Sequence, residues 1–453
     1  MQSESAEPGI TSLIRVHQMR FEDLMTGKTF EFAINTFLNL MYPLVPLVER
    51  SSFLKRLEKG RTNPDPGLFR LCISICAFTM GCFTKKFAQL SVDAHSMILR
   101  ACQLFAISRL QSDAMDLDSC VSHIFLAMAR SAVSLSMDGW SIANEGILRC
   151  RELGIGDRER YAGLPLMEQQ IRKRTFWVYF IMLITDRLLS SIPHTITIGD
   201  YTTTDWSFLV PEEVPDDQPD SATSEASGGP NEPSVISAFI GLVLVYLPAA
   251  RVLSSGVISV NQPPKTLLRE LAIIHSDIQE ATKNRPPHLH IQQDRPPATT
   301  TERQLDIMRT NIDTSSLFLQ SYLVEQSISL YESTEKPVFD NPNIGRPRIW
   351  TLRIEAAAEL LSCLTKSSPE ALESNGAFLV SKIKAIAATL IPREEDMLPN
   401  FDEVRKQGET YVRELVQFIE KLDYVSKAAM DVYSVDANFG FPRAAGPFGE
   451  FNP

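Results

Sequence analysis

EQQIRKRTFWVYFIMLITDRLLS, from Glu168 to Ser190, indicates the fold class of this 453-residue chain more clearly than any other segment. Its middle part, Phe176 to Ile184, is apolar at every position. A helix that is hydrophobic on all sides is normally enclosed by other elements, because none of its faces suits water. The stretch therefore predicts a long central helix at the core of an all-α fold.

Helical spacing continues before this stretch. Apolar residues between Leu68 and Thr79 recur every three or four positions, which places them on one helical face. Asp116 and Asp118 precede the periodic run 121–128, where N-cap residues are expected. A similar pattern begins at Trp140 and ends at Gly154, which is typical of a helix stop.

The part of the chain after Ser190 also favours helices. The run VISAFIGLVLVYL, from Val235 to Leu247, is shorter than the roughly 20 apolar residues that cross a membrane, so it indicates a buried helix. The best candidate strand, Thr195 to Ile198, is short, and no alternating pattern calls for a sheet. We expect later helices near Pro264–Thr282, Glu302–Tyr331, Ile349–Thr365, Asn375–Ile391 and Phe401–Ser426.

Changes in composition divide the chain into segments. Residues 211–234 carry seven carboxylates among prolines, serines and glycines, which is typical of a solvated acidic linker. The C-terminal stretch has four phenylalanines in loose sequence. We therefore predict a large multi-helix domain with an internal acidic disordered linker. The predicted segments are a flexible N-terminus (1–20), a first helical half (21–206), the linker (207–233), a second helical half (234–433) and a disordered tail (434–453).

The charge and cysteine content limit the class of function. The net charge is −11 and the pI is about 5.3, whereas nucleic-acid binding usually needs a basic surface. No signal peptide opens the chain, and its seven cysteines are an odd, scattered set. Reduced thiols in the nucleus or cytoplasm are the natural interpretation.

No motif in the sequence predicts a metal centre or an active site. Cys72 and Cys76 share a helical face with Cys82 nearby, but a structural zinc site needs four ligands, so core cysteines are the better interpretation. His288 and His290 form only a weak pair, and the aspartates around residue 116 are expected to cap a helix. No nucleophile elbow, metalloprotease helix, phosphate loop or dinucleotide fingerprint occurs. We expect no cofactor, no metal and no enzymatic activity.

Basic residues cluster within and before the stretch from Glu168 to Ser190. They alternate with carboxylates, which favours a solvated or ion-paired helix surface over a track for phosphates. Arg172 and Asp186 are 14 positions apart, which is about 21 Å along one helix, so they cannot pair with each other. We expect each to find partners on neighbouring helices, because a buried charge without a partner is costly. The basic residues are Arg149, Arg151, Arg158, Arg160, Arg172, Lys173 and Arg174.

Several segments, in order, resemble the middle homology region of fungal binuclear-zinc-cluster transcription factors. YPLVPLVERSSF, from Tyr42 to Phe53, resembles the opening of that region, and WSIANEGILRCRELG, from Trp140 to Gly154, resembles one of its helices. The stretch from Glu168 to Ser190 resembles its most specific signature, and weaker similarity continues to Asp423. The matching residues, to which we assign structural roles, are Trp140, Gly146, Gly154, Glu168, Arg172, Arg174, Phe176, Trp177, Asp186 and Arg187.

The resemblance implies a regulatory protein of transcription. Family members normally begin with a cysteine-rich zinc cluster and a coiled coil, whereas here no cysteine precedes Cys72. The resemblance therefore implies the regulatory region alone, in the nucleus and also the cytoplasm, controlling a metabolic or secondary-metabolite gene set. Expected partners are other transcription factors or coregulators, with a small-molecule inducer as a further candidate. Direct DNA binding and membrane association are not expected. The alternative is a helical small-molecule sensor or enzyme on the same scaffold, which a closed polar pocket with convergent titratable groups would favour.

Overall fold

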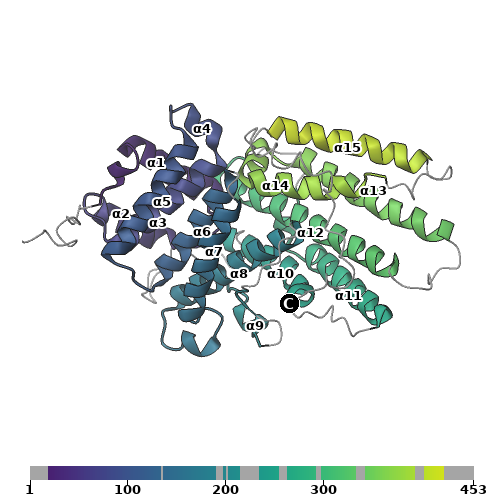
Figure 1. The fold of residues 1–453 in the computed structure, drawn as a ribbon, viewed down its shortest axis with the longest axis horizontal. Helices are drawn as coiled ribbons and strands as arrows, with labels where there is room; N and C mark the ends of the chain where they lie inside the picture. Colours follow the sequence, from purple (N-terminus) through teal and green to yellow (C-terminus); the bar gives the residue numbers. More distant parts are fainter. Residues whose placement is uncertain are drawn as a thin grey trace, which may run out of the picture.

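The computed structural model describes residues 19–133, 136–189, 197–199, 203–214, 234–254, 263–291, 297–332, 342–392 and 402–422. Within these ranges all regular structure is helical and no strand occurs, which confirms the all-α prediction (Figure 1). Of the candidate strand, Thr197 and Ile198 are described and lie in irregular structure, while residues 195 and 196 lie outside the described residues.

The first half of the chain contains the long helix α8, which includes the stretch from Glu168 to Leu189, and the helices that precede it. A π-helical turn, η3, ends at Met41, directly before Tyr42 and Pro43. The elements are η2 (Phe21–Asp23), α1 (Gly27–Thr36), η3 (Phe37–Met41), α2 (Arg50–Gly60), α3 (Pro66–Cys82), α4 (Thr84–Ala88), α5 (Ala94–Gln111), α6 (Leu117–Ala132), α7 (Ser136–Glu152), η4 (Arg158–Tyr161), α8 (Leu166–Leu189) and α9 (Trp206–Leu209).

The second half contains all five of the later helices that the sequence predicts. The largest difference is at the start of α13, which begins seven residues earlier than expected, at Pro342. The elements are α10 (Val235–Ser254), α11 (Pro264–Lys283), η5 (Pro287–Leu289), α12 (Thr300–Glu332), α13 (Pro342–Lys366), α14 (Pro369–Thr389) and α15 (Asp402–Leu422).

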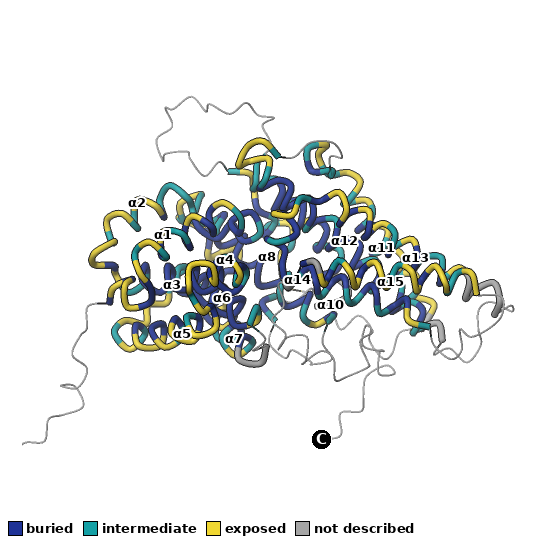
Figure 2. Tube along the Cα trace, turned by 90° about the horizontal axis from the view of Figure 1, so that it is seen from above, coloured by how far each residue is buried: buried dark blue, intermediate teal, exposed yellow. Residues whose placement is uncertain are grey.

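The helices pack in two groups with α8 between them (Figure 1). In the first group, α3 packs against α5 and α6, and α6 packs against α7. In the second group, α12 contacts α10, α11, α13 and α14, while α15 covers α13 and α14. Exposed residues lie on the outer faces of both groups, and α8 passes through the buried interior (Figure 2).

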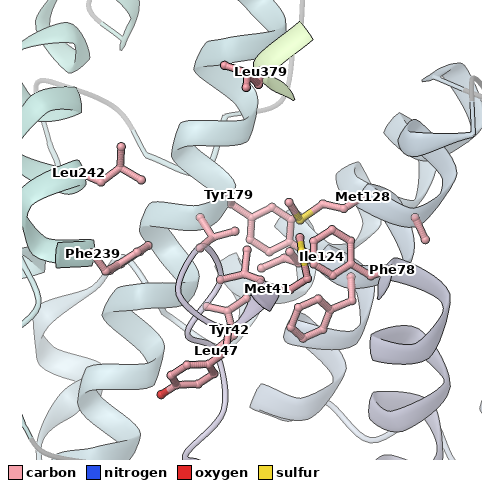
Figure 3. Close-up of a cluster of buried hydrophobic side chains, with 14 of the residues drawn as sticks. Met41, Tyr42, Leu47, Phe78, Ile124, Met128, Tyr179, Phe239, Leu242 and Leu379 are labelled. Atoms are coloured by element: carbon pink, nitrogen blue, oxygen red, sulfur yellow. The ribbon is translucent and has the colours of Figure 1, made fainter. Parts of the chain in front are cut away.

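One hydrophobic core extends through both groups. It includes Phe78 of α3, Ile124 of α6, Tyr179 of α8 and Leu242 of α10 (Figure 3). The predicted burial of residues 176–184 is confirmed for seven of these nine positions, while the other two, Ile181 and Met182, are half-buried.

One of the two predicted N-cap residues of α6 is confirmed, whereas Asp118 lies within the first turn of this helix and pairs with Arg56. The Asp116 carboxylate is the N-cap of α6 and accepts a hydrogen bond from the Ser119 amide at 2.8 Å. The apolar run of α10 is part of the core, as predicted. Among the described residues, no helix is long and apolar enough to cross a membrane.

Candidate functional site at the junction of α7 and α8

Gly146 of α7 lies directly against residues of α6 and α8. A Cβ atom built on it would overlap the Tyr179 hydroxyl and would lie 2.7 Å from Cβ of His123. The Tyr179 hydroxyl is buried and donates a hydrogen bond to the Cys120 carbonyl oxygen at 3.1 Å. Trp140, in the first part of α7, is half-buried against the core. The glycine therefore lets α7 pack directly on the hydroxyl that joins α8 to α6.

Gly154 lies two residues after the end of α7 and terminates this helix. Its φ of +71° suits glycine, and its amide donates to the Arg151 carbonyl at 3.0 Å. The Ile155 amide donates to the Cys150 carbonyl at 2.9 Å, which completes a Schellman motif. The predicted helix stop is therefore confirmed.

Arg172 of α8 binds the end of this motif. Its Nη1 donates to the Leu153 carbonyl at 3.2 Å, while Nε and Nη2 donate to Oε1 of Glu168 at 3.1 and 2.8 Å. The ion pair thus lies within α8, and the contact with α7 is made through a main-chain oxygen. Arg172 was expected to find partners on neighbouring helices. The Leu153 carbonyl at the end of α7 is such a partner, whereas the ion-pair partner, Glu168, lies one turn away on its own helix.

The next two basic residues are buried. Lys173 is 4% exposed; its Nζ lies 3.2 Å from Oε1 of Glu212 and 4.7 Å from the centre of the Phe208 ring. Arg174 is fully buried and donates to the Pro46 carbonyl at 3.4 Å, and burial lowers its pKa to about 10. Lys173 and Arg149 are buried but ion-paired, with Glu212 and with Asp113 and Glu145, which agrees with the predicted ion-paired interpretation. For Arg174 the predicted surface position is wrong, because it is fully buried and donates to a main-chain oxygen.

An aromatic cluster follows along α8. The rings of Phe176, Trp177 and Phe180 lie 4.9–5.9 Å from the ring of Trp206, the first residue of α9. Nε1 of Trp177 donates to the Leu209 carbonyl at 2.9 Å. These contacts hold the α9 segment on α8.

The beginning of the predicted acidic linker takes part in this packing. The Glu212 amide donates to Oε1 of Gln170 at 2.7 Å, and the Ser234 hydroxyl donates to the Glu213 carboxylate. Residues 215–233 lie outside the described residues, as does the predicted tail, 434–453.

Asp186 and Arg187 lie at the other end of α8. Asp186 is half-buried and Arg187 is exposed, with a charge that acts on the Tyr322 hydroxyl of α12. The structure therefore does not bring them together with the Glu168–Arg172 pair, although all four belong to one stretch of sequence.

A second charge network connects α5, α6 and α7. Nη2 of Arg149 lies 2.8 Å from Oδ2 of Asp113 and 3.3 Å from Oε1 of Glu145, while Nη2 of Arg109 binds Glu145 at 2.6 Å. The pKa of Asp113 is lowered to about 2, chiefly by its hydrogen bond from Arg149. The pKa of Glu145 is lowered to about 2, first by His123, whose Nε2 lies 3.7 Å away, and then by Arg109.

The cysteines and histidines do not converge. All seven cysteines are free thiols, and burial raises the pKa of Cys82 and that of Cys363 to about 12. His288 contacts the Ser237 hydroxyl at 3.3 Å, whereas His290 contacts Arg285. In the part of the chain that the structure describes, no group of three or more His, Cys, Asp or Glu residues could hold a metal ion.

Sequence reasoning missed two features of this region. The burial of Lys173 and Arg174 was missed because basic residues that alternate with carboxylates usually indicate a surface. The α9 contact was missed because the sequence 205–214 contains proline and carboxylates, although Trp206 and Phe208 could have indicated a packed segment.

Comparison with known proteins supplies the family. No curated protein and no solved structure matches the chain. The model of the family described as the fungal specific transcription factor domain matches residues 34–306, which is more than half of the chain. The match includes α7, α8 and the whole junction described above. The chain therefore belongs to the fungal specific transcription factor domain family.

Proposed function

We propose that this protein is a transcription regulatory module that acts in the nucleus through protein partners and does not read DNA itself. The observation that carries the proposal is the family match over residues 34–306, because this family is described by its role in transcription. The genes under its control are proposed to be a metabolic or secondary-metabolite set, and its partners are proposed to be other transcription factors or coregulators.

The state of the basic residues supports regulation without DNA contact. A protein that binds phosphates needs Lys and Arg side chains that are free to reach them. Here Arg172 binds Glu168, Lys173 binds Glu212, and Arg174 is fully buried. The chain also carries a net charge of −11, which opposes approach to a polyanion.

Two segments are candidates for contact with protein partners. The first is the acidic linker from Glu212 to Glu232, and the second is the tail from Phe439 to Phe451. Acidic and aromatic residues at this density suit weak binding that is accompanied by folding. Glu212 and Glu213 are already bound to Lys173 and Ser234, so residues 215–233 are the part of the linker that remains for this role.

A tethering experiment tests the proposal. The chain is fused to a heterologous DNA-binding domain in fungal host cells, and a reporter with the matching site is measured. We expect a change in reporter activity of several-fold, reduced when Asp216, Asp217, Asp220, Glu225 and Glu232 are replaced by Asn or Gln. A matched control replaces the same number of exposed carboxylates on α15, which should leave the effect intact. A stable, nuclear fusion without any effect on the reporter would contradict the proposal.

A further inference from the structure

Lys382 of α14 is a buried lysine that has only neutral partners. Its side chain is 4% exposed. Nζ donates to Oδ1 of Asn311 at 3.0 Å and to Oγ of Ser315 at 2.7 Å, both on α12. Among the described residues it forms no ion pair. Lysine is rarely buried without a counter-ion, since its charged form is strongly stabilised by water.

The contacts of Lys382 continue through a line of hydroxyl groups. The Tyr246 hydroxyl of α10 is hydrogen-bonded to Ser315, and it lies 3.2 Å from Oγ1 of Thr185 on α8. The line therefore runs from α8, which lies between the two groups of helices, to α10, α12 and α14 of the second group. A change of charge at Lys382 therefore acts directly on the contact between α14 and α12.

The titratable groups around Lys382 do not supply a negative charge at neutral pH. On α13, Cys363 would act on Lys382 only as a negatively charged thiolate. Burial raises the pKa of this thiol to about 12, so it stays protonated and neutral. On α10, burial also raises the pKa of Tyr246. Neither group can therefore compensate a charged ammonium.

The carboxylates of α12 that lie closest in sequence to Asn311 and Ser315 have other partners. Asp313 is paired with Arg285, and Asp306 accepts a hydrogen bond from the Ser368 amide at 3.2 Å. The remaining elements that pack on α14 are α3, α15 and η3. Among their described residues, no charged group is bonded to Lys382. At the start of α14, Glu373 is paired with Lys86 of α4.

Burial therefore favours the neutral amine. It lowers the pKa of Lys382 from 10.5 to about 7, which is within the range where small changes of pH alter its charge. The neutral amine retains its hydrogen bonds to Asn311 and Ser315, whereas the ammonium adds a charge that the surroundings do not balance.

We propose that Lys382 is a proton-operated switch, which holds α14 against α12 while it is neutral and loosens the C-terminal helices α13–α15 when it takes up a proton. In a regulatory protein such a switch makes the surface of these helices respond to the pH of the compartment. The proposal concerns the folded chain alone and does not depend on which partners it has.

The direction of the pH dependence follows from the two states. The folded form has the lower pKa, so between about pH 7 and 10.5 the unfolded chain binds more protons than the folded chain. The free energy of unfolding therefore rises with pH through this window. The destabilisation that the charged ammonium causes reaches its full size below about pH 7. The equilibrium constant for opening of these helices should be about tenfold larger at pH 6 than at pH 8.

The test compares the full chain with two variants in urea at pH 6, 7, 8 and 9. In Lys382→Met a neutral side chain of similar length replaces the amine. We expect its unfolding midpoint at pH 6 to exceed that of the wild type, and to rise less with pH. The control, Lys366→Met, removes an exposed lysine at the end of α13 and should follow the wild type. Parallel pH profiles for the wild type and Lys382→Met would overturn the proposal.

Hydrogen exchange locates the effect. After correction for intrinsic rates, peptides from α13–α15 in the wild type should exchange about tenfold faster at pH 6 than at pH 8. Peptides from α1–α5 should show no such difference. If Lys382→Met fails to fold, Lys382→Gln takes its place, and if both fail, the wild-type exchange decides. Equal corrected exchange of α13–α15 at the two pH values would refute the switch.

Discussion

Gly146 of α7 faces the hydroxyl of Tyr179 on α8, and a Cβ atom on the glycine would overlap this oxygen. The same Cβ would lie 2.7 Å from Cβ of His123 on α6. Three helices therefore meet at a point that only a hydrogen atom can fill.

Replacing Gly146 by alanine should destabilise the protein. Alanine favours a helix by about 1 kcal/mol over glycine, but overpacking costs about 1–3 kcal/mol or more, and the Tyr179 hydroxyl would also lose its bond to Cys120. We expect a net loss that chemical denaturation can measure. The control is Gly27→Ala at the start of α1, where nothing lies within 4 Å of the added Cβ. Equal stability of both variants would contradict the close packing.

Trp177→Phe should loosen the α9 segment. The change removes the indole N–H that donates to the Leu209 carbonyl at 2.9 Å, and an unsatisfied buried carbonyl costs about 1–3 kcal/mol. Limited proteolysis should then cut faster within residues 203–214. Trp350→Phe serves as a control, because the buried Nε1 of Trp350 makes no hydrogen bond among the described residues. In the control, residues 203–214 should resist the protease as they do in the wild type. Equal resistance of Trp177→Phe would show that the Trp177–Leu209 hydrogen bond does not hold this segment on α8.

Acid should weaken the network around Arg149. Asp113 and Glu145 have pKa values lowered to about 2, from 3.8 and 4.5, so the stability that they contribute is present above about pH 4.5 and is lost as the pH falls toward 2. Both side chains are partly exposed, so we expect a modest effect. Arg149→Met should reduce the loss of stability between pH 5 and 2, whereas Arg151→Met, an exposed residue on the same helix, should not. The measurement is the unfolding midpoint in urea as a function of pH.

The purified chain should carry no stoichiometric zinc. Cys72 and Cys76 are buried side by side in α3, and burial raises the pKa of both thiols, which disfavours the thiolates that zinc needs. Elemental analysis after dialysis should find well under one zinc ion per chain. One or two tightly held zinc ions would show that the cysteines form a site that the sequence spacing does not reveal.

The fold could be predicted where local chemistry determines it. The apolar surface around Phe176 required an enclosed helix, the position of Asp116 required a cap, and Gly154 required a stop, and all three agree with the structure. These features depend on residues close in sequence, so one sequence is enough to find them.

The site could be predicted less well, because it depends on which distant segments meet. The basic triplet that ends at Arg174 has the pattern of a surface, but Arg174 is covered by the segment at Pro46, and Lys173 by the segment that follows α9. The row of Thr310, Asn311 and Ser315 likewise reads as a solvated face of α12, yet Thr310 and Ser315 are buried and Asn311 and Ser315 bind Lys382 of α14. No spacing rule connects positions more than 60 residues apart.

The central claim is that this member of the fungal transcription factor domain family influences transcription without reading DNA. A gel-shift titration of the purified full chain on promoter DNA, at about 150 mM salt, tests it most directly, because weak binding driven by charge alone fades at that salt concentration. Our account predicts no shifted band that survives an excess of unrelated competitor DNA, while the same promoter is bound once a DNA-binding partner is added. A sequence-specific complex formed by the chain alone would contradict it.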